Sequence, residues 1–418
     1  MRFAILRLAL RSLANRRASV LLTLLTVAVS VTLFLGVEKV RQGARESFEN
    51  TISGAELIVG ARSSPVNLML YAVFHIGDAT NNITWESYRT VAGAPDVAWT
   101  VPISLGDSHR GFRVVGTDNR YFEHYQYAGG RSLAFAQGRE LSDLFDAVVG
   151  AGVARELGYQ TGDEIIVAHG GGSVSFVEHD ANPFTIVGVL EPTGTPTDRS
   201  VFVSLEAIEA IHLEGATGRG TSRSVEELRA MNLQPEQITA FLVGLENPVA
   251  ALRLQRAVNT YPGEPLQAVI PGVALAQLWQ VVGAAQRTLA VIAAIVVLTG
   301  LVSILTSILS SLNERRREMA ILRALGARPH HIFTLLVLEA ALVAFAGALV
   351  GAGLTYGALS LAAPLLETRY GILITGVAPG LYDLAVVAIV TLAAAALGAI
   401  PAWRAFRNSL ADGMTIRV

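Results

Sequence analysis

The stretch that decides the fold is NERRREMAILRALGARPHHIFTLLVLE, residues 313–339. Its first half has an amphipathic helical pattern, in which apolar residues such as Leu322 and Leu325 recur at every third position and charged residues fill the positions between them. Gly326 and Pro329 predict the end of this helix. Because apolar runs long enough to cross a bilayer lie on both sides, the sequence predicts a short basic helix at a membrane surface.

The composition predicts a few membrane spans combined with a large aqueous part. Hydrophobic residues make up 52% of the 418 residues, which is more than in an ordinary soluble protein and less than in a chain that lies wholly in the membrane. The net charge of −2 does not point to nucleic acid, and no basic patch with interleaved aromatic residues suggests such a partner. The absence of cysteine excludes disulfides, thiol nucleophiles and cysteine zinc sites.

Four apolar runs have the length of a membrane span. They are residues 19–37, 288–312, 332–354 and 384–400. For the first run a cleaved signal peptide is the alternative. The apolar core of such a peptide would be shorter, and the charged residues that follow this run offer no small-residue cleavage site.

Arginines gather in three of the remaining segments. These are residues 1–18, which have the pattern of an amphipathic helix on the membrane surface, the central loop 313–331 and the tail 401–418. The positive-inside rule places all three segments, and therefore both termini, in the cytoplasm. Residues 355–383 are then expected to form a short outer loop.

Residues 38–287 contain no further span and mix strand and helix patterns. FTIVGVL at 184–190 predicts a strand, and residues 239–270 predict a strand, a helix and a strand in succession. Both ends of the segment have helical patterns that continue the neighbouring spans as stalks. We therefore expect an α-helical membrane protein with four transmembrane helices and a large aqueous α+β domain inserted between helices 1 and 2.

Two motifs carry a resemblance to a known family. The order REMAILRALGA at 317–327, followed by glycines in the third apolar run, resembles the cytoplasmic loop and third membrane helix of the MacB/FtsX-like ABC permeases, also called type VII or mechanotransmission transporters. Residues 138–165, GRELSDLFDAVVGAGVARELGYQTGDEI, resemble the MacB-like periplasmic core domain. The tail departs from the family pattern, because Asn408, Ser409 and Leu410 stand where a proline is usual.

The resemblance implies that the helix at residues 314–325 docks on a separate ATPase subunit. The expected ATPase-coupling residues are Arg315, Arg316, Arg317, Glu318, Leu322, Arg323 and Leu325. The alternative is an ordinary loop whose arginines only fix the orientation of the chain in the membrane. A P-loop requires Gly-x4-Gly-Lys-Ser/Thr, and the only lysine, Lys39, follows a glutamate. We therefore expect no cofactor on this chain, with ATP and Mg bound by another polypeptide.

Five residues in or just after the third span are candidates for packing between membrane helices. They are Glu339, Gly347, Gly351, Gly353 and Gly357. A carboxylate inside a span is expected to face a partner or water, either as a latch between the coupling helix and its neighbours or as a structural residue. The two Gly-x3-Gly pairs allow close approach of a second helix, which belongs either to the same chain or to a second permease chain.

Two features of the aqueous domain leave alternatives open. In the apolar segment 63–82, Leu68, Met69, Tyr71 and Phe74 belong either to an ordinary buried helix or to an adaptable surface for a lipid-bearing or hydrophobic substrate. His169, His179 and Asp180 surround a glycine-rich turn and are weak candidates for zinc ligands, because their spacing matches no specific metal signature.

The resemblance implies a permease subunit that is not itself an enzyme. Its large domain would be periplasmic and would change shape to export, extract or release a periplasmic or membrane-associated substrate. The expected partners are an ABC ATPase subunit, a second permease chain of the same or a related sequence, a periplasmic adaptor or lipoprotein, and membrane lipid, at the bacterial inner membrane. The alternative is an FtsX-like signalling subunit that controls a periplasmic cell-wall hydrolase without transport.

Overall fold

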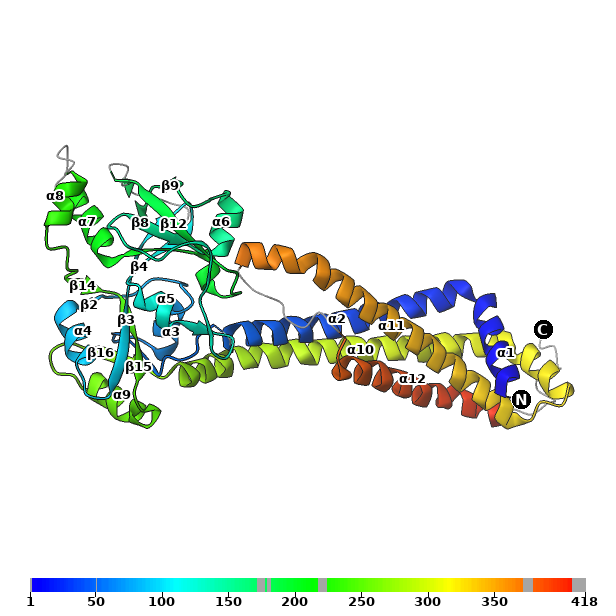
Figure 1. Ribbon diagram of the computed structural model, residues 1–418. Coiled ribbons are helices and arrows are strands. Elements are labelled where there is room, and N and C mark those ends of the chain that lie inside the picture. Colours follow the sequence, from blue (N-terminus) through cyan, green and yellow to red (C-terminus); the bar gives the residue numbers. More distant parts are fainter. Residues whose placement is uncertain are drawn as a thin grey trace. The chain divides into compact units, whose positions relative to one another are not determined.

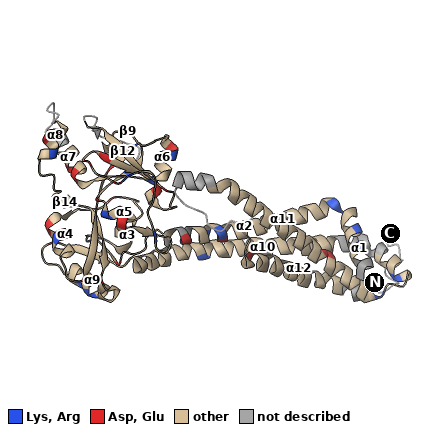
Figure 2. Cartoon of the chain, in the orientation of Figure 1, with Lys and Arg blue, Asp and Glu red and all other residues tan. Residues whose placement is uncertain are grey.

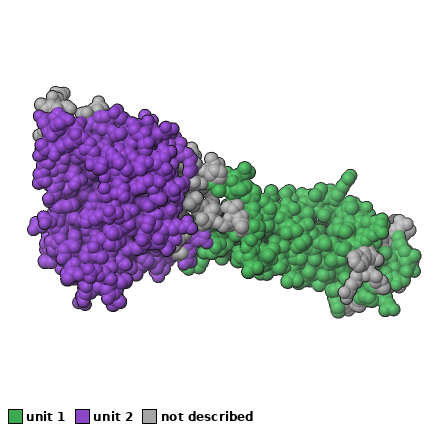
Figure 3. Space-filling view, viewed as in Figure 1, with its two compact units in different colours: residues 1–43, 283–364, 375–418 green, residues 44–282, 365–374 purple. Residues whose placement is uncertain are grey.

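The computed structural model describes residues 2–49, 51–170, 177–178, 182–216, 224–370 and 379–407. It forms two compact units, which Figure 3 shows in different colours. Unit 1 comprises residues 1–43, 283–364 and 375–418, and unit 2 comprises residues 44–282 and 365–374.

Unit 1 is built from long helices (Figure 1). They are α1 (Arg2–Asn15), α12 (Leu381–Arg407) and the larger parts of α2 (Arg17–Glu49), α10 (Pro271–Ala324) and α11 (Pro329–Tyr370). Four of them are long and apolar enough to cross a membrane, over Arg17–Gly43, Pro271–Ser310, Pro329–Ala363 and Leu381–Trp403. Charged side chains are sparse along these four helices (Figure 2). The structure therefore confirms a long apolar helix at each of the four predicted spans.

Two predicted boundaries in unit 1 are wrong. The coupling helix is not a separate element, because α10 continues from the second span to Ala324 and no glycine or proline interrupts residues 301–325. The outer loop expected at 355–383 is helical over its first half, since α11 extends to Tyr370. Alanine and leucine are frequent in that part of α11, and both favour the helix.

Unit 2 contains a mixed sheet of twelve strands in the order β16-β1-β15-β3-β4-β13-β8-β12-β7, with β9, β10 and β11 pairing at its side. β12 pairs with β8, and β13 with β4, in parallel, whereas the other pairs are antiparallel. The strands are β1 (Leu57–Ala61), β3 (Val97–His109), β4 (Phe112–Thr117), β7 (Phe135–Gly138), β8 (Asp146–Val149), β9 (Glu164–Ile165), β10 (Ala168–His169), β11 (Val177–Glu178), β12 (Phe184–Leu190), β13 (Ser200–Ser204), β15 (Ala240–Leu245) and β16 (Leu266–Val269).

Helices and two short ladders complete unit 2. The ladders are β2 (Ile83–Thr84) with β14 (Gln237–Ile238), and β5 (Gln126–Tyr127) with β6 (Arg131–Ser132). The helices are α3 (Pro65–Ala72), α4 (Trp85–Ala92), α5 (Arg120–His124), α6 (Ala151–Leu157), η1 (Pro196–Arg199), α7 (Leu205–Ala216), α8 (Val225–Ala230), η2 (Pro248–Ala250) and α9 (Ala251–Asn259). The strand predicted at 184–190 and the strand, helix and strand predicted within 239–270 are confirmed as β12, β15, α9 and β16.

Both faces of the sheet are covered, as strand β1 shows. Ile58 packs in a core cluster that includes Leu68 of α3. Its neighbours Leu57 and Val59 pack in a second cluster that includes Leu254 of α9. Because successive side chains of a strand point to opposite faces, an apolar run such as LIVGA is buried on both sides.

Candidate functional site

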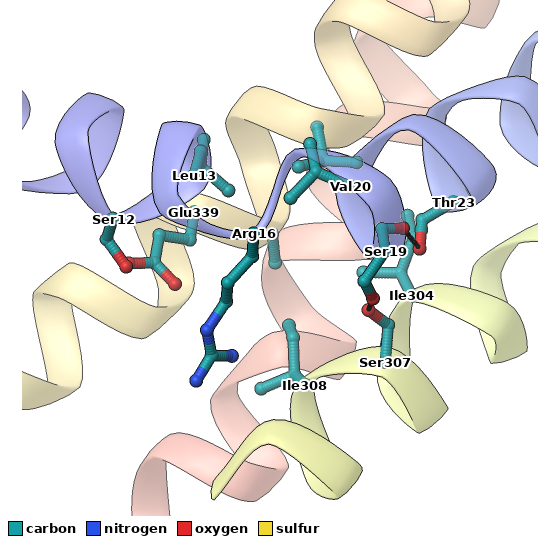
Figure 4. A pocket seen from close by; sticks show the side chains of 12 residues that line it. Ser12, Leu13, Arg16, Ser19, Val20, Thr23, Ile304, Ser307, Ile308 and Glu339 are labelled. Atoms are coloured by element: carbon teal, nitrogen blue, oxygen red, sulfur yellow. Dashed lines mark hydrogen bonds between the residues drawn. The ribbon is translucent and has the colours of Figure 1, made fainter. Parts of the chain in front are cut away.

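A small cavity of about 40 Å³ lies among four helices of unit 1 (Figure 4). Its lining comes from α1, α2 and the residue between them, from α10 and from α11. The lining residues are Ser12, Leu13, Arg16, Ser19, Val20, Thr23, Ile304, Ser307, Ile308, Glu339, Ala340 and Val343. The cavity has room for water, because one water molecule needs about 15 Å³, and polar side chains stand among its mostly apolar lining.

The chain bends between α1 and α2 at Arg16. The backbone N–H of Arg16 donates to the carbonyl of Leu13 at 3.1 Å, and the Arg16 carbonyl accepts from Val20 at 3.0 Å. This elbow places Ser12, Leu13 and Arg16 together on the cavity (Figure 4). The amphipathic segment predicted at 1–18 thus contributes directly to the interior of unit 1.

Glu339 is the acidic residue of this cavity. Only 6% of its surface is exposed, and it lines the cavity from α11. In Figure 4 the Ser12 hydroxyl points toward the Glu339 carboxylate. A charge inside a membrane span costs about 3 kcal/mol on insertion scales, so a cavity lined by hydroxyl groups and an arginine is a more favourable place than a lipid-facing surface. The latch role of Glu339 stays a prediction.

Hydroxyl groups link α2 and α10 beside the cavity. The Ser19 and Ser307 hydroxyls lie 3.1 Å apart, within hydrogen-bonding distance. Thr23 donates its hydroxyl to the Ser19 carbonyl at 2.9 Å, one turn back along its own helix. The Ser19–Ser307 contact joins α10 to α2 three residues after the elbow at Arg16.

The coupling segment ends in a tight helix stop. Gly326, at φ +95°, donates its N–H to Arg323 O, and Ala327 donates to Leu322 O, both at 2.9 Å. This is the Schellman arrangement, which favours glycine because its left-handed conformation strains other residues. Pro329 then begins α11, and the N–H of Arg328 donates to Nδ1 of His331 at 3.2 Å. Two helices are thereby joined through four residues, 325–328.

The structure places the predicted coupling residues at the end of α10 and in this junction. Leu322 and Arg323 are half-buried, whereas Leu325 is 81% exposed at the tip. Arg315, Arg316, Arg317 and Glu318 lie on helical backbone, and their side chains are outside the described part of the chain. Contact of these seven residues with an ATPase stays a prediction.

The glycines of α11 divide into two groups. A Cβ atom at Gly347 would lie 2.9 Å from Cβ of Val27, and one at Gly351 would lie 2.5 Å from the Ala28 carbonyl oxygen, so both glycines pack α11 directly against α2. A Cβ atom at Gly353 or Gly357 would meet no atom within 4 Å among the described residues. The first pair therefore serves packing within the chain, and the second pair faces away from it.

The hypothesis of a substrate surface at Leu68, Met69, Tyr71 and Phe74 is contradicted. All four side chains are buried, with exposed fractions of 5% or less. The N-cap Ser64 accepts from the N–H of Asn67 at the start of α3, and the helix packs into the core of unit 2. The alternative of an ordinary buried helix is correct, because these large apolar side chains lose more exposed area in the core than on a surface.

The proposed metal ligands lie largely outside the described residues. His179 and Asp180 are not described, and for His169 only the backbone is, in strand β10 opposite Asp107. Among the described residues no group of three histidine, aspartate or glutamate side chains has the arrangement of a metal site. The zinc hypothesis therefore stays an untested prediction.

The 138–165 motif builds a local ion-pair network whose central residue, Asp146, the sequence did not single out. Asp146 Oδ2 accepts from Arg139 at 2.7 Å and from the N–H groups of Ser142 and Asp143 at 2.8 and 2.9 Å. Burial raises the pKa of Asp146, but the Arg139 hydrogen bond and the two N–H groups outweigh burial and lower it. Gly138, at φ +79°, leaves no space for a Cβ beside the Val187 carbonyl.

Comparison with known families identifies the chain. The family described as MacB-like periplasmic core domain matches residues 20–261, more than half of the chain, and the family described as FtsX-like permease C-terminal matches residues 290–410. The chain belongs to the MacB/FtsX-like permeases. The first match takes in most of the first predicted span and most of the predicted aqueous domain, and the second takes in nearly all of the last three predicted spans.

Curated relatives of this MacB/FtsX-like permease bear the name macrolide export ATP-binding/permease protein MacB. It is 24% identical over 387 residues to the macrolide export ATP-binding/permease protein MacB of Nitrosomonas europaea, covering 85% of this chain and 51% of that protein. It is 26% identical over 386 residues to the protein of the same name from Azoarcus sp., covering 88% of this chain and 54% of that protein. The chain thus spans about half the length of the curated relatives it matches.

Among solved structures, the periplasmic region of MacB from Actinobacillus actinomycetemcomitans matches this permease with a TM-score of 0.34 and 12% identity. The match covers 54% of this chain and 94% of that one.

Sequence reasoning missed the residues that share a cavity with Glu339 in this permease. Ser12 and Arg16 share a cavity with it, although they lie at the opposite end of the chain. The periodicity of 1–18 indicates an amphipathic helix, but it carries no information on which distant residue faces that helix. The only usable signal was the general rule that a carboxylate inside a span needs polar neighbours.

Proposed function

We propose that this chain is the permease subunit of an ABC transporter and transmits the motion of a separate ABC ATPase to a periplasmic domain. The two family matches, which follow one another along the chain, are the observation that carries the proposal. Residues 44–282, which hold the mixed sheet, would then be the periplasmic domain inserted between the first and second spans. Both termini and the junction between α10 and α11 would be cytoplasmic at the bacterial inner membrane, as the positive-inside rule indicates.

The α10 tip supplies the surface for the ATPase. Leu325 is exposed directly before Gly326 of the Schellman stop, and the segment before it carries three consecutive arginines, Arg315, Arg316 and Arg317. Because α10 is continuous from Pro271 to Ala324, a push at this tip would travel along the helix without a flexible joint. ATP and Mg would be bound by the ATPase, and this chain would carry no cofactor.

The moving periplasmic domain would export, extract or release a periplasmic or membrane-associated substrate. A second permease chain, a periplasmic adaptor or lipoprotein, and membrane lipid are the other proposed partners. Gly353 and Gly357, which pack against nothing within this chain's described residues, provide a face for the second permease chain. The FtsX-like signalling alternative is not favoured, because the longer match is to the MacB-like periplasmic core domain.

The test is recruitment of the ATPase. The tagged chain would be purified from its native membranes, and the ATPase that accompanies it would be identified by mass spectrometry and reconstituted with it in nanodiscs. Replacing Leu322 and Leu325 together with aspartate should abolish recruitment and permease-stimulated ATP hydrolysis. Leu252→Asp, at a 69% exposed leucine of α9, is the matched control and should change neither. Retained co-purification of the Leu322/Leu325 double variant would contradict the proposal.

A further inference from the structure

The only lysine of the chain takes part in a buried ion pair between membrane helices. Lys39 Nζ, on α2, lies 3.1 Å from Oδ2 of Asp383, in the first turn of α12. Tyr356 of α11 donates its hydroxyl to the same oxygen, and the N–H of Gly380 donates to it at 2.7 Å. Lys39 also lies over the Tyr356 ring, 5.7 Å from its centroid. One carboxylate oxygen thus joins α2, α11 and α12.

The pair is well shielded from solvent. The Lys39 and Asp383 side chains are only 14% and 4% exposed. Screening by salt is weak for a buried pair, and separating its members would leave a charge unpaired in an apolar environment. This differs from an exposed surface pair, in which water replaces the lost partner. Separating α2, α11 and α12 at this point is therefore strongly disfavoured.

The same three helices are tied together further along their length. Thr32 donates its hydroxyl to the Gly351 carbonyl at 3.0 Å, and Thr355 donates to the Thr32 carbonyl at 3.3 Å, so α2 and α11 exchange hydrogen bonds. A Cβ atom at Gly398 of α12 would lie 2.7 Å from Cβ of Ala340 on α11. These close contacts leave little freedom for one of the three helices to slide past another.

The fourth long helix, α10, contributes no atom to this ion pair. Its polar links to α2 are the Ser30 hydroxyl, which donates to the Val296 carbonyl at 3.0 Å, and the Ser19–Ser307 contact. Toward its Ala324 end, α10 has apolar contacts with α11 through Ile308 and Met319. Midway along its length, Leu301 and Ile304 are buried in the apolar core that α2, α11 and α12 share, whereas Val291 and Leu298 are 59% and 57% exposed.

We propose that Lys39, Tyr356 and Asp383 form a clamp that makes α2, α11 and α12 move as one rigid body, against which α10 moves as a separate lever. The second part rests on the proposed function, because α10 carries the ATPase-coupling tip. The first part concerns unit 1 alone. The four apolar helices of unit 1 then form a body of three helices and a single helix, α10. This helix pivots where Ser30 contacts Gly300, at which a Cβ atom would lie 2.9 Å from the Ser30 hydroxyl oxygen.

The first experiment measures the clamp without any partner. The chain has no cysteine, so spin labels attached at Val40→Cys and Leu384→Cys, which are 52% and 62% exposed, report the separation of α2 and α12 in nanodiscs. We expect a narrow distance distribution in the otherwise unchanged chain and a distribution at least twice as wide after Asp383→Asn or Lys39→Met. Arg287→Met, an exposed cation of α10, is the control and should leave the distribution narrow.

The double variant Lys39→Met/Asp383→Asn separates loss of the clamp from misfolding. It leaves no unpaired charge, so its thermal unfolding temperature should recover part of the loss that Asp383→Asn causes. Its distance distribution should nevertheless stay wide, since the link is gone. A narrow distribution in the single and double variants would overturn the proposal.

The second experiment tests the lever. With the co-purifying ATPase and ATP, the distance between labels at Val40→Cys and Val291→Cys should shift by several ångströms, while that between Val40→Cys and Leu384→Cys stays fixed. Equal shifts in both pairs would overturn the rigid-body proposal. If no ATPase binds, the proposed function fails, and the first experiment still decides the clamp.

Discussion

Gly351 of α11 lies against the backbone of Ala28 in α2, so closely that a Cβ atom would sit 2.5 Å from the Ala28 carbonyl oxygen. A contact this short forces a backbone shift, because the obstructing atom belongs to the main chain. We predict that Gly351→Ala lowers the stability of unit 1 by about 1–3 kcal/mol, the range for overpacking a well-packed core. The measurement is thermal unfolding of the purified chain in detergent.

Gly353 provides the matched control, since a Cβ atom there meets nothing within 4 Å in the described structure. Gly353→Ala should leave the unfolding temperature unchanged or raise it slightly, because alanine favours a helix by roughly 1 kcal/mol over glycine. Equal losses for both variants would show that the contact with Ala28 is not the cause.

Glu339 offers a test of the latch hypothesis. Glu339→Gln keeps the shape of the side chain and removes its charge from the cavity. The latch hypothesis holds that the Glu339 charge links the elbow at Arg16 to α11. If it does, Glu339→Gln should lower permease-stimulated ATP hydrolysis about tenfold, equivalent to about 1.4 kcal/mol of activation free energy. The unfolding temperature shows whether the fold is kept. The control is Thr299→Val on α10, because the Thr299 hydroxyl donates to the Ile295 carbonyl of the same helix. Unchanged stimulation would favour the structural alternative.

Asp146 should stabilise unit 2 through its charge. Its pKa is lowered in the folded chain, so its contribution is present above the unfolded value of about 3.9 and is lost as the pH falls through the folded pKa. At neutral pH we expect Asp146→Asn to cost about 2–3 kcal/mol, as for hydrogen bonds to a charged group. Hydrogen exchange of the Ser142 and Asp143 amides, read by mass spectrometry, should accelerate.

The comparison for Asp146 is an ion pair on the surface. Asp96 lies 2.6 Å from Arg253, with side-chain exposures of 29% and 73%. Asp96→Asn should therefore cost less than about 1 kcal/mol and leave exchange at residues 142 and 143 unchanged. If Asp146→Asn and Asp96→Asn lowered the stability equally, burial of Asp146 would contribute nothing to the stability of unit 2.

We predict that protonation of His75 makes the folded chain less stable in mild acid. Burial, with a smaller contribution from Arg113, lowers the pKa of His75 to about 4. Because Ser200 donates its hydroxyl to the Pro196 carbonyl, the neutral His75 ring donates from Nδ1 to Ser200, at 2.8 Å. The unfolded chain, with a pKa of about 6.5, then binds the proton first, so stability falls from about pH 6.5 to about pH 4.

The variant that checks this prediction is His75→Asn. His75 has φ +54°, a conformation that asparagine tolerates better than most residues. The variant should show a smaller dependence of the unfolding temperature on pH between 4 and 6.5 than the unchanged chain. An identical pH profile in the two proteins would assign the acid sensitivity to other groups.

Local patterns predicted much of this fold. The run FTIVGVL has the bounds of β12 because its apolar residues and its flanking turn residues are adjacent in sequence. The extent of the helices was harder to predict, since α10 and α11 continue past the ends of their apolar runs to Ala324 and Tyr370. A helix ends where its backbone is interrupted, as at Gly326, and not where its side chains become polar.

Burial of α3 illustrates the limit of the same reasoning. Leu68 and Phe74 gave an apolar pattern that suits a core helix and an exposed binding surface equally well. Only the packing of Leu68 against β1, where Gly60 leaves space for its side chain, decides between them. Burial of apolar side chains is favourable, but their pattern in the sequence does not show which part of the molecule covers them.

The sequence by itself determined four apolar spans, a strand-rich aqueous domain and the family, because hydrophobic length, periodicity and short motifs are properties of neighbouring residues. Only the tertiary structure decided that Glu339 shares a cavity with Arg16, that Gly351 rather than Gly353 contacts α2, and that Lys39 pairs with Asp383. Each of these relationships joins residues far apart in the chain. Such residues meet only when helices pack. The sequence pattern of one helix does not specify how that helix is rotated about its axis relative to its neighbours.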